Sequence, residues 1–214
     1  MNFRHLMLAM LIKFIQRFSS KEAVVRGTRY ILSKNVFHPK YFYTSEFMAE
    51  NMEIKEGSIV LDMGTGSGII AIEASRKASI VVAVDVNPEA IEIARKNAEI
   101  NRRNNIIFIK SNLFSSIPPM KFDAILFNPP YLEGKPKSYF DYAIYDYKKS
   151  IIKNFLRKAK NYLKDDGHIE IVYSSISSPL HMVKYAERIG WKVKKMAEKE
   201  IRKEKIYLFK LFWH

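Results

Sequence analysis

The alternation of strand-like and helix-like segments is the feature that most constrains this 214-residue chain. Short apolar runs alternate with longer segments whose apolar residues recur every three or four positions, which are the patterns of buried strands and amphipathic helices. Strands are predicted at 58–61, 80–84, 106–109, 124–127, 168–173, 191–196 and 206–212, and helices at 69–76, 88–101, 148–163 and 179–189. Repeated strand and helix units predict an α/β fold with a mostly parallel sheet covered on both faces.

Residues 1–43 precede this alternation, and we expect them to form an extension to a domain at 44–214. Apolar residues at helical spacing between Phe3 and Phe18 predict an amphipathic helix. Its apolar stripe should cover something, by default the main domain, or else a partner protein or a membrane surface. A hairpin turning at Gly27 is expected next.

Two segments lead into the predicted domain. Residues 36–39 should be extended, and Thr44 or Ser45 is expected to cap a helix that runs to about Met52. The apolar run at 6–12 is far shorter than the roughly 20 residues that a membrane-spanning helix needs. We therefore expect no membrane span.

The net charge of +14 is concentrated at the two ends of the chain. Residues 1–40 carry eight Lys or Arg against one Glu, and residues 181–214 carry ten against four acids. Residues 41–180 are nearly balanced, with eighteen against seventeen. Basic ends suit a polyanion such as RNA, because phosphate neutralisation supplies most sequence-independent binding. A solvated basic surface is the alternative.

Cysteine is absent, which excludes disulfides and thiol chemistry and fits a cytoplasmic protein. His38 and His181 have no histidine or acidic neighbours at metal-ligand spacing. We therefore interpret both as structural or surface histidines and predict no metal site.

A glycine-rich loop joins the strand at 58–61 to the following helix. It reads Asp62-Met63-Gly64-Thr65-Gly66-Ser67-Gly68, and its glycines permit positive φ and a close approach of the backbone to a ligand. The spacing Gly-x-Gly-x-Gly differs from the dinucleotide fingerprint, and the Lys followed by Ser or Thr of a P-loop is absent. A dehydrogenase is therefore disfavoured.

Two carboxylates lie at strand ends near this loop. Asp85 follows the strand at 80–84, where a carboxylate can accept both hydroxyls of a ribose. Asp62 lies where it can hold an ammonium group directly or through water, which suits the methionine end of S-adenosylmethionine and not a nicotinamide. The pair predicts an S-adenosylmethionine site.

The glycine loop and the strand that ends at Asp85 are followed by Asn128-Pro129-Pro130-Tyr131. This order of motifs resembles that of class I methyltransferases of the HemK type. The chain resembles that family over about residues 36–175. The family includes release-factor glutamine methyltransferases and related adenine and guanine amino methyltransferases. The resemblance implies the Rossmann-like class I fold, a seven-stranded sheet with its last strand antiparallel, and S-adenosyl-L-methionine as cofactor. The implied cofactor-binding residues are Asp62, Gly64, Thr65, Gly66, Gly68, Asp85, Val86, Asn112, Leu113, Asn128 and Thr44.

The motif at 128–131 suits methylation of a planar nitrogen, whose delocalised lone pair makes it a poor nucleophile. The Asn128 side-chain carbonyl and the Pro129 backbone carbonyl would each accept an N–H and aim the lone pair at the methyl carbon. Pro130 and Pro129 stiffen the loop, and Tyr131 is expected to stack its ring on the flat acceptor. We predict all four residues to be catalytic. The alternative is an ordinary proline turn that ends a strand.

Three features match the family less closely. Asn112 stands where the family usually has Asp to meet the adenine amine, and Asn keeps an acceptor but adds a donor. Thr44 and Phe37-His38-Pro39 resemble the segment that folds over the methionine end. The glycine-rich segment that often follows the motif is replaced by an aromatic and acidic stretch at 139–146, which we expect to shape the substrate pocket.

The motif leaves two acceptors open: a glutamine amide in a translation factor, or an exocyclic amine of adenine or guanine in RNA or DNA. The short chain resembles the small archaeal and eukaryotic glutamine methyltransferases, which pair with a small zinc-binding activator subunit. The basic ends favour RNA, although a ribosome-bound protein would also favour positive charge. A non-catalytic S-adenosylmethionine-binding subunit is disfavoured because loop and motif are both intact. We predict N-methylation in a component of the translation machinery.

Overall fold

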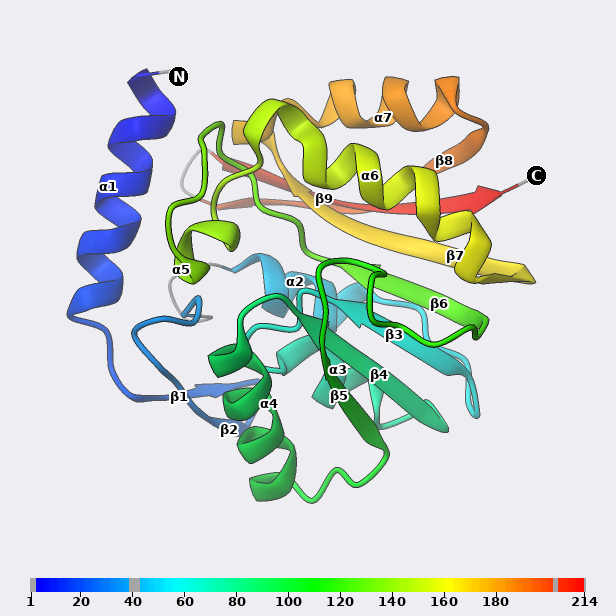
Figure 1. Cartoon of the computed structure of the whole chain (residues 1–214), viewed down its shortest axis with the longest axis horizontal. Coiled ribbons are helices and arrows are strands. Elements are labelled where there is room, and N and C mark those ends of the chain that lie inside the picture. The colour runs from blue at the N-terminus through cyan, green and yellow to red at the C-terminus, as the bar shows by residue number, and fades with distance from the viewer. Residues whose placement is uncertain (1–2, 39–42, 202–203, 214) are drawn as a thin grey trace.

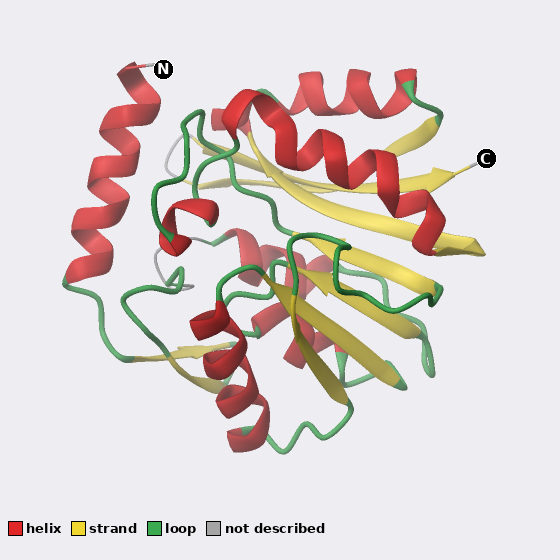
Figure 2. Ribbon diagram, viewed as in Figure 1, coloured by secondary structure: helices red, strands yellow, loops and turns green. Residues whose placement is uncertain are grey.

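The computed structural model describes residues 3–38, 43–201 and 204–213, and its centre is a seven-stranded sheet in the order β5-β4-β3-β6-β7-β9-β8 (Figures 1 and 2). The parallel strands are β3 (Ile59–Met63), β4 (Ile80–Asp85), β5 (Ile106–Lys110), β6 (Phe122–Phe127) and β7 (Leu163–Ser174). The last strand, β9 (Glu204–Trp213), runs antiparallel to β7 and to β8 (Trp191–Ile201). The predicted α/β fold and antiparallel last strand are confirmed.

Helices cover both faces of the sheet because alternate strand residues point to opposite sides. Val60 packs with residues of α2 and α3, whereas Leu61 and Met63 pack with residues of α6 and α7. The helices are α2 (Thr44–Asn51), α3 (Ile69–Ala74), α4 (Pro88–Ile100), α5 (Tyr139–Tyr142), α6 (Ser150–Ala159) and α7 (Pro179–Arg188). Short 3₁₀ turns are η1 (Tyr147–Lys149), η2 (Lys160–Tyr162) and η3 (Ser175–Ser177). Within the described ranges, every helix is too short or too polar to span a bilayer.

The N-terminal segment forms the predicted helix and hairpin, α1 (Phe3–Arg17), β1 (Glu22–Val25) and β2 (Thr28–Ile31). The hairpin shares a small apolar core with α3 and α4. Helix α1 lies at one edge of the molecule (Figure 1) and buries only Ala9, Ile12 and Gln16. The expectation that its apolar stripe is covered by the main domain is wrong for six large side chains, which remain exposed: Phe3, Met7, Met10, Leu11, Phe14 and Phe18.

Two local predictions are wrong, for identifiable reasons. Helix α2 has Tyr43 at its N-cap without a side-chain cap bond, because the Thr44 and Ser45 hydroxyls both accept hydrogen bonds from Asn128 instead. The helix predicted at 148–163 begins only at Ser150, because the two lysines before it adopt left-handed backbone angles that an α-helix cannot include.

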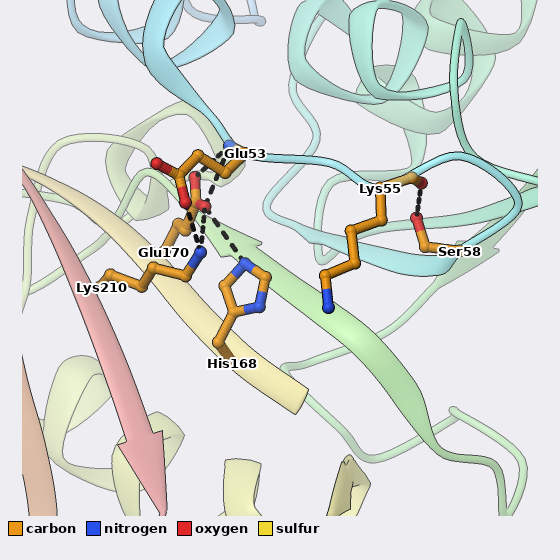
Figure 3. A network of polar contacts seen from close by, with 6 residues as sticks. All are labelled: Glu53, Lys55, Ser58, His168, Glu170 and Lys210. Carbon is orange, nitrogen blue, oxygen red and sulfur yellow. Dashed lines mark hydrogen bonds and ion pairs between the residues drawn. The ribbon is translucent and has the colours of Figure 1, made fainter. Parts of the chain in front are cut away.

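A buried polar network joins the end of α2 to the sheet (Figure 3). Glu170 of β7 is fully buried, and its carboxylate accepts a hydrogen bond from the backbone N–H of Glu53 at 3.0 Å. Nε2 of His168 lies 3.1 Å from the same carboxylate, and Nζ of Lys210 lies 3.9 Å from it. Lys210 also pairs with Glu53 at 2.7 Å and lowers the pKa of that carboxyl. Glu170 therefore anchors the segment between α2 and β3 to the middle of the sheet.

We predict that Glu170→Ala lowers the free energy of unfolding by about 2–3 kcal/mol, because the backbone N–H of Glu53 and the buried His168 lose their acceptor. Urea unfolding should show a lower midpoint with an unchanged slope. Glu200→Ala, at an exposed position on β8, is the control and should change stability by less than about 0.5 kcal/mol. Equal effects of the two substitutions would show that the buried network does not anchor α2.

Candidate functional site

The carboxyl ends of β3, β4 and β6 meet at one edge of the sheet and open into a pocket. Parallel register pairs Met63 with Val84 and Phe127, so the three loops that follow emerge side by side. Ligands of open α/β sheets bind at this edge, where the strand order reverses. The predicted site residues that line the pocket are Gly64, Thr65, Gly66, Asp85, Val86, Asn112, Leu113, Asn128, Pro129, Pro130 and Tyr131.

The glycine loop is held against β4 by its backbone and by Asp85. The N–H groups of Gly64 and Thr65 donate to the Val84 carbonyl at 2.8 and 2.9 Å. Asp85 accepts the N–H of Gly66 at 2.9 Å with Oδ2 and that of Asn87 at 2.9 Å with Oδ1. Each carboxylate oxygen keeps a further acceptor position, so both can still receive a ribose hydroxyl.

Two glycines of the loop have different roles. Gly66 has φ +55°, and a Cβ built there would meet nothing within 4 Å, because the position faces the open pocket. Gly68 lies outside the pocket lining, and a Cβ there would approach the Cβ of Ala94 to 3.1 Å. Gly66 therefore leaves room for a ligand, whereas Gly68 lets α3 and α4 pack closely.

Asp62 lies beneath the loop and is completely buried, so it does not line the pocket directly. Neither of its carboxylate oxygens makes a hydrogen bond to the described residues, and the Thr65 hydroxyl is likewise without a partner among them. Burial raises the pKa of Asp62 to about 7, and nearby Thr65 and Ala71 only partly offset this rise. A buried carboxylate of this kind is stabilised by an added cation or donor. The amino group of a bound S-adenosylmethionine fits that need.

Asn128 is fixed in one orientation by residues far away in the sequence. Its Nδ2 donates to Thr44 Oγ1 at 3.1 Å and to Ser45 Oγ at 2.9 Å. The amide oxygen, Oδ1, therefore points the other way and accepts the hydroxyl of Tyr131. An amide oxygen has two lone pairs, so Oδ1 can also accept an N–H from a substrate. Thr44 thus acts here through Asn128, since the structure does not place it in the pocket lining.

Tyr131 turns its hydroxyl inward. The hydroxyl donates to Asn128 and lies 3.3 Å from the Val172 carbonyl, while the ring packs edge-on against Tyr173. Burial raises the pKa of Tyr131 well above its ordinary value, so the phenol stays protonated and remains a donor. The hydrogen bond from Tyr131 therefore helps to hold Asn128 in place, a role that the sequence did not indicate. Stacking of the Tyr131 ring on a substrate stays a prediction.

The backbone carbonyl of Tyr131 is held by two donors that sequence reasoning missed. Ser177 Oγ donates to it, and Lys149 Nζ lies 3.3 Å from it and also contacts Ser177. Burial lowers the pKa of Lys149, opposed by the charges of Asp146 and Glu133. Asp146 is itself buried and accepts the N–H groups of Ile151 and Ile152, in the first turn of α6, at 2.8 and 3.1 Å.

This arrangement explains the backbone angles before α6. Lys148 and Lys149 have φ of +54° and +56°, a region that glycine enters more easily. The left-handed turn directs the Lys149 side chain toward the Tyr131 carbonyl. The sequence carried no signal for this contact.

Side chains from segments distant in the sequence also line the pocket. They are Phe37, Ser45, Tyr139, Tyr142 and Ile151. The aromatic stretch at 139–146 therefore contributes to the pocket as expected, through Tyr139 and Tyr142. Ser45 and Ile151 were not identified from the sequence as pocket residues.

The remaining candidates have other positions. His38 is buried, with Ser20 Oγ 3.3 Å from its Nε2, and His181 is exposed on α7, in keeping with structural and surface roles. Pro39 lies outside the described residues. Asn112 is exposed at the pocket rim, where its amide is accessible to a ligand.

Comparison with protein families finds the methyltransferase small domain over residues 29–200. A protein of Methanocaldococcus jannaschii with the provisional name protein N5-glutamine methyltransferase is 34% identical over 179 residues, covering 79% of this chain and 90% of that protein. Release factor glutamine methyltransferases of Fusobacterium nucleatum and Leptospira interrogans are 33% and 34% identical, covering 57% and 64% of this chain. This chain spans 39% and 55% of their lengths.

Solved structures share the fold at lower identity. The Mtq2–Trm112 complex of E. cuniculi, responsible for methylation of the eRF1 translation termination factor, matches with a TM-score of 0.61 at 22% identity, covering 84% of this chain and 99% of that chain. Trm5 of Methanocaldococcus jannaschii in complex with adenosine matches with a TM-score of 0.66 at 18% identity, covering 92% and 57%. At these identities the likeness concerns the fold alone.

We predict that Asp62→Asn changes the pH dependence of stability. A pKa of about 7 in the folded protein, above the ordinary 3.8, means that the folded state favours the protonated acid. The stability this provides is present below about pH 4 and is lost as the pH rises to about 7. The variant should therefore gain about 1–3 kcal/mol relative to the parent between pH 5 and pH 8, measured by urea unfolding. A difference independent of pH would contradict the assignment.

Proposed function

This chain belongs to the methyltransferase small domain family, and we propose that it is an S-adenosylmethionine-dependent enzyme that methylates the side-chain amide nitrogen of a glutamine in a protein of the translation machinery. The main support for this proposal is the orientation of Asn128. Its amide is fixed by two hydrogen bonds, in the same pocket as the glycine loop. The glutamine methyltransferases among the relatives support this acceptor. The reaction belongs in the cytoplasm, where such factors act.

The cofactor-binding half of the pocket suits S-adenosylmethionine. When bound, that molecule supplies an electrophilic methyl group on a sulfonium with a neutral leaving group. In this assignment Asp85 binds the ribose hydroxyls, Asp62 balances the charge of the amino group, and Gly66 leaves the space above the loop open. Val86, Leu113 and Asn112 line the same pocket and would hold the adenine, with the Asn112 amide available to its amine.

The acceptor half orients the nucleophile. Oδ1 of Asn128 and the Pro129 carbonyl each accept one N–H of the substrate amide, which directs the nitrogen lone pair out of conjugation and toward the methyl carbon. The new N–C bond would form as the methyl–sulfur bond breaks, the sulfur leaving as a neutral thioether, and one N–H proton would go to solvent. Tyr131 keeps Asn128 in place throughout, because its phenol stays protonated. Positioning is the main catalytic contribution.

A second candidate acceptor is an exocyclic amine of a base in RNA. The net charge of +14 favours it, because a basic surface attracts phosphate. A small activator subunit is a further part of the proposal, on the ground that Mtq2 was solved as a complex with Trm112.

The experiment that separates these acceptors is incubation of the purified protein with methyl-labelled S-adenosylmethionine and, separately, translation factors or total RNA. We expect label in a release factor, and we expect that label to be lost after a Gln→Ala change at the modified site. Label in RNA alone would overturn the glutamine acceptor. Absence of label in every fraction, with and without a zinc-binding activator, together with no cofactor binding by calorimetry, would overturn both.

We predict that Asn128→Ala and Asp85→Ala separate chemistry from cofactor binding. Asn128→Ala should keep the cofactor Kd within about threefold and lower kcat by about 100-fold or more, as for loss of a group that stabilises the transition state. Asp85→Ala should instead weaken cofactor binding, because the ribose hydroxyls lose their acceptor. Loss of cofactor affinity in the Asn128 variant would show that its role is misassigned.

We predict that Lys149 positions the 128–131 loop through the Tyr131 carbonyl. Lys149→Met should lower kcat by about 10-fold or more while the cofactor Kd stays unchanged, because the loop loses a fixed donor. Lys149→Arg should restore part of kcat. Lys148→Met is the matched control, since Lys148 is an exposed neighbour with the same left-handed backbone. Equal losses in both lysine variants would indicate an effect of the turn alone.

A further inference from the structure

Helix α1 carries a large exposed apolar face. Five side chains on it, and Phe18 directly after its end, have exposed fractions between 52% and 73%. They are Phe3, Met7, Met10, Leu11, Phe14 and Phe18. Contiguous apolar patches of this size on a soluble protein mark interaction sites. The helix also precedes the region at 29–200 that matches the family, so the known site does not account for this face.

The opposite face of α1 is already fixed to the body of the protein. Ala9 and Ile12 pack with Leu132, Ile144 and Tyr145 of the loop that follows the motif. Lys13 pairs with Asp141 at 2.6 Å, and His5 Nδ1 accepts the N–H of Glu133 at 2.9 Å. The helix cannot rotate to bury its apolar face without breaking these contacts, so that face remains available to a partner.

The spacing on the exposed face suits a second helix. Phe3, Met7, Met10 and Phe14 follow one another at intervals of four, three and four, the a and d pattern of a two-helix seam. The six side chains expose on the order of 700 Å² in each copy, taking about 200 Å² for a large side chain. A stable interface buries about 800 Å² per partner. Packing this face against the same face of a second copy would therefore bury nearly the area per partner that a stable dimer needs.

The charges of α1 disfavour an anionic membrane as the partner. The helix has no acidic residue, but Lys13 and His5, two of its basic residues, are engaged with the protein body. A membrane-surface helix instead uses a row of free Lys and Arg beside its apolar face. The seam pattern and the area fit a helix better than a lipid surface.

We propose that α1 is a dimerisation helix whose exposed face packs antiparallel against α1 of a second copy of this chain. Met10 lies at the middle of the stripe and would sit on the two-fold axis. Antiparallel packing sets Arg17 beside the second copy's Phe3, a cation–π contact, whereas parallel packing would oppose two arginines. The pairing also stabilises α1 against the loop at 132–145, which shapes the mouth of the pocket.

The test begins with the mass of the full chain in solution, measured by light scattering and sedimentation over a range of concentrations. We expect a dimer, and Met10→Glu should weaken it by about 100-fold or more by placing two carboxylates face to face. Leu180→Glu is the matched control, because Leu180 of α7 is exposed to the same 60% as Met10. It should leave the dimer intact, and circular dichroism should show both variants folded.

Cysteine cross-linking locates the interface, since the chain has no cysteine of its own. Met10→Cys should give a covalent dimer with a short bis-maleimide, and Leu180→Cys should not. A monomer at every concentration overturns the proposal, and so does a dimer that cross-links through position 180 alone. A monomer that floats with phosphatidylglycerol vesicles, but not with phosphatidylcholine vesicles, overturns it in favour of a lipid surface. None of these outcomes depends on the acceptor of the methyl group.

Discussion

The parallel pairing of β3 with β4 and β6 is the constraint on which the site depends. It places the ends of these strands at one edge, so that the glycine loop, Asp85 and Asn128 emerge together although they are far apart in the chain. Helices on both faces bury the alternate side chains of these strands and fix their register. A one-residue slip would turn every side chain of a strand to the opposite face. The pocket is thus a direct consequence of core packing.

Two carboxylates beside the pocket are buried in a way that disfavours their charged forms when no ligand is bound. Asp62 is buried without a hydrogen bond to the described residues, and burial raises the pKa of Asp85 as well. Glu170, a buried carboxylate away from the pocket, is instead satisfied by Glu53, His168 and Lys210 (Figure 3). The contrast between Asp62 and Glu170 is what a binding site needs, since an unpaired buried carboxylate is stabilised when a ligand supplies the missing donor.

Sequence reasoning reached the strands, most helices and the pocket-lining motifs, and failed where long-range contacts override local preference. Thr44 and Ser45 are residue types that often cap helices. Their hydroxyls instead accept hydrogen bonds from the Asn128 side chain, more than eighty residues away. Lys148 and Lys149 fit a helical pattern, yet they form a left-handed turn because Lys149 binds the Tyr131 carbonyl. The stripe of α1 was recognised as apolar, but the pattern could not show which face docks on the protein.

The sequence by itself determined the fold class, the glycine loop, Asp85 and the Asn-Pro-Pro-Tyr motif, because these depend on periodicity and on residue types within short segments. The tertiary structure alone decided how Asn128 is oriented, that Tyr131 supports it, and that Lys149 and Ser177 hold the loop beneath. These contacts join residues that are between three and 84 positions apart. Their partners are chosen by the packing of the sheet and its helices, and no local pattern encodes that choice.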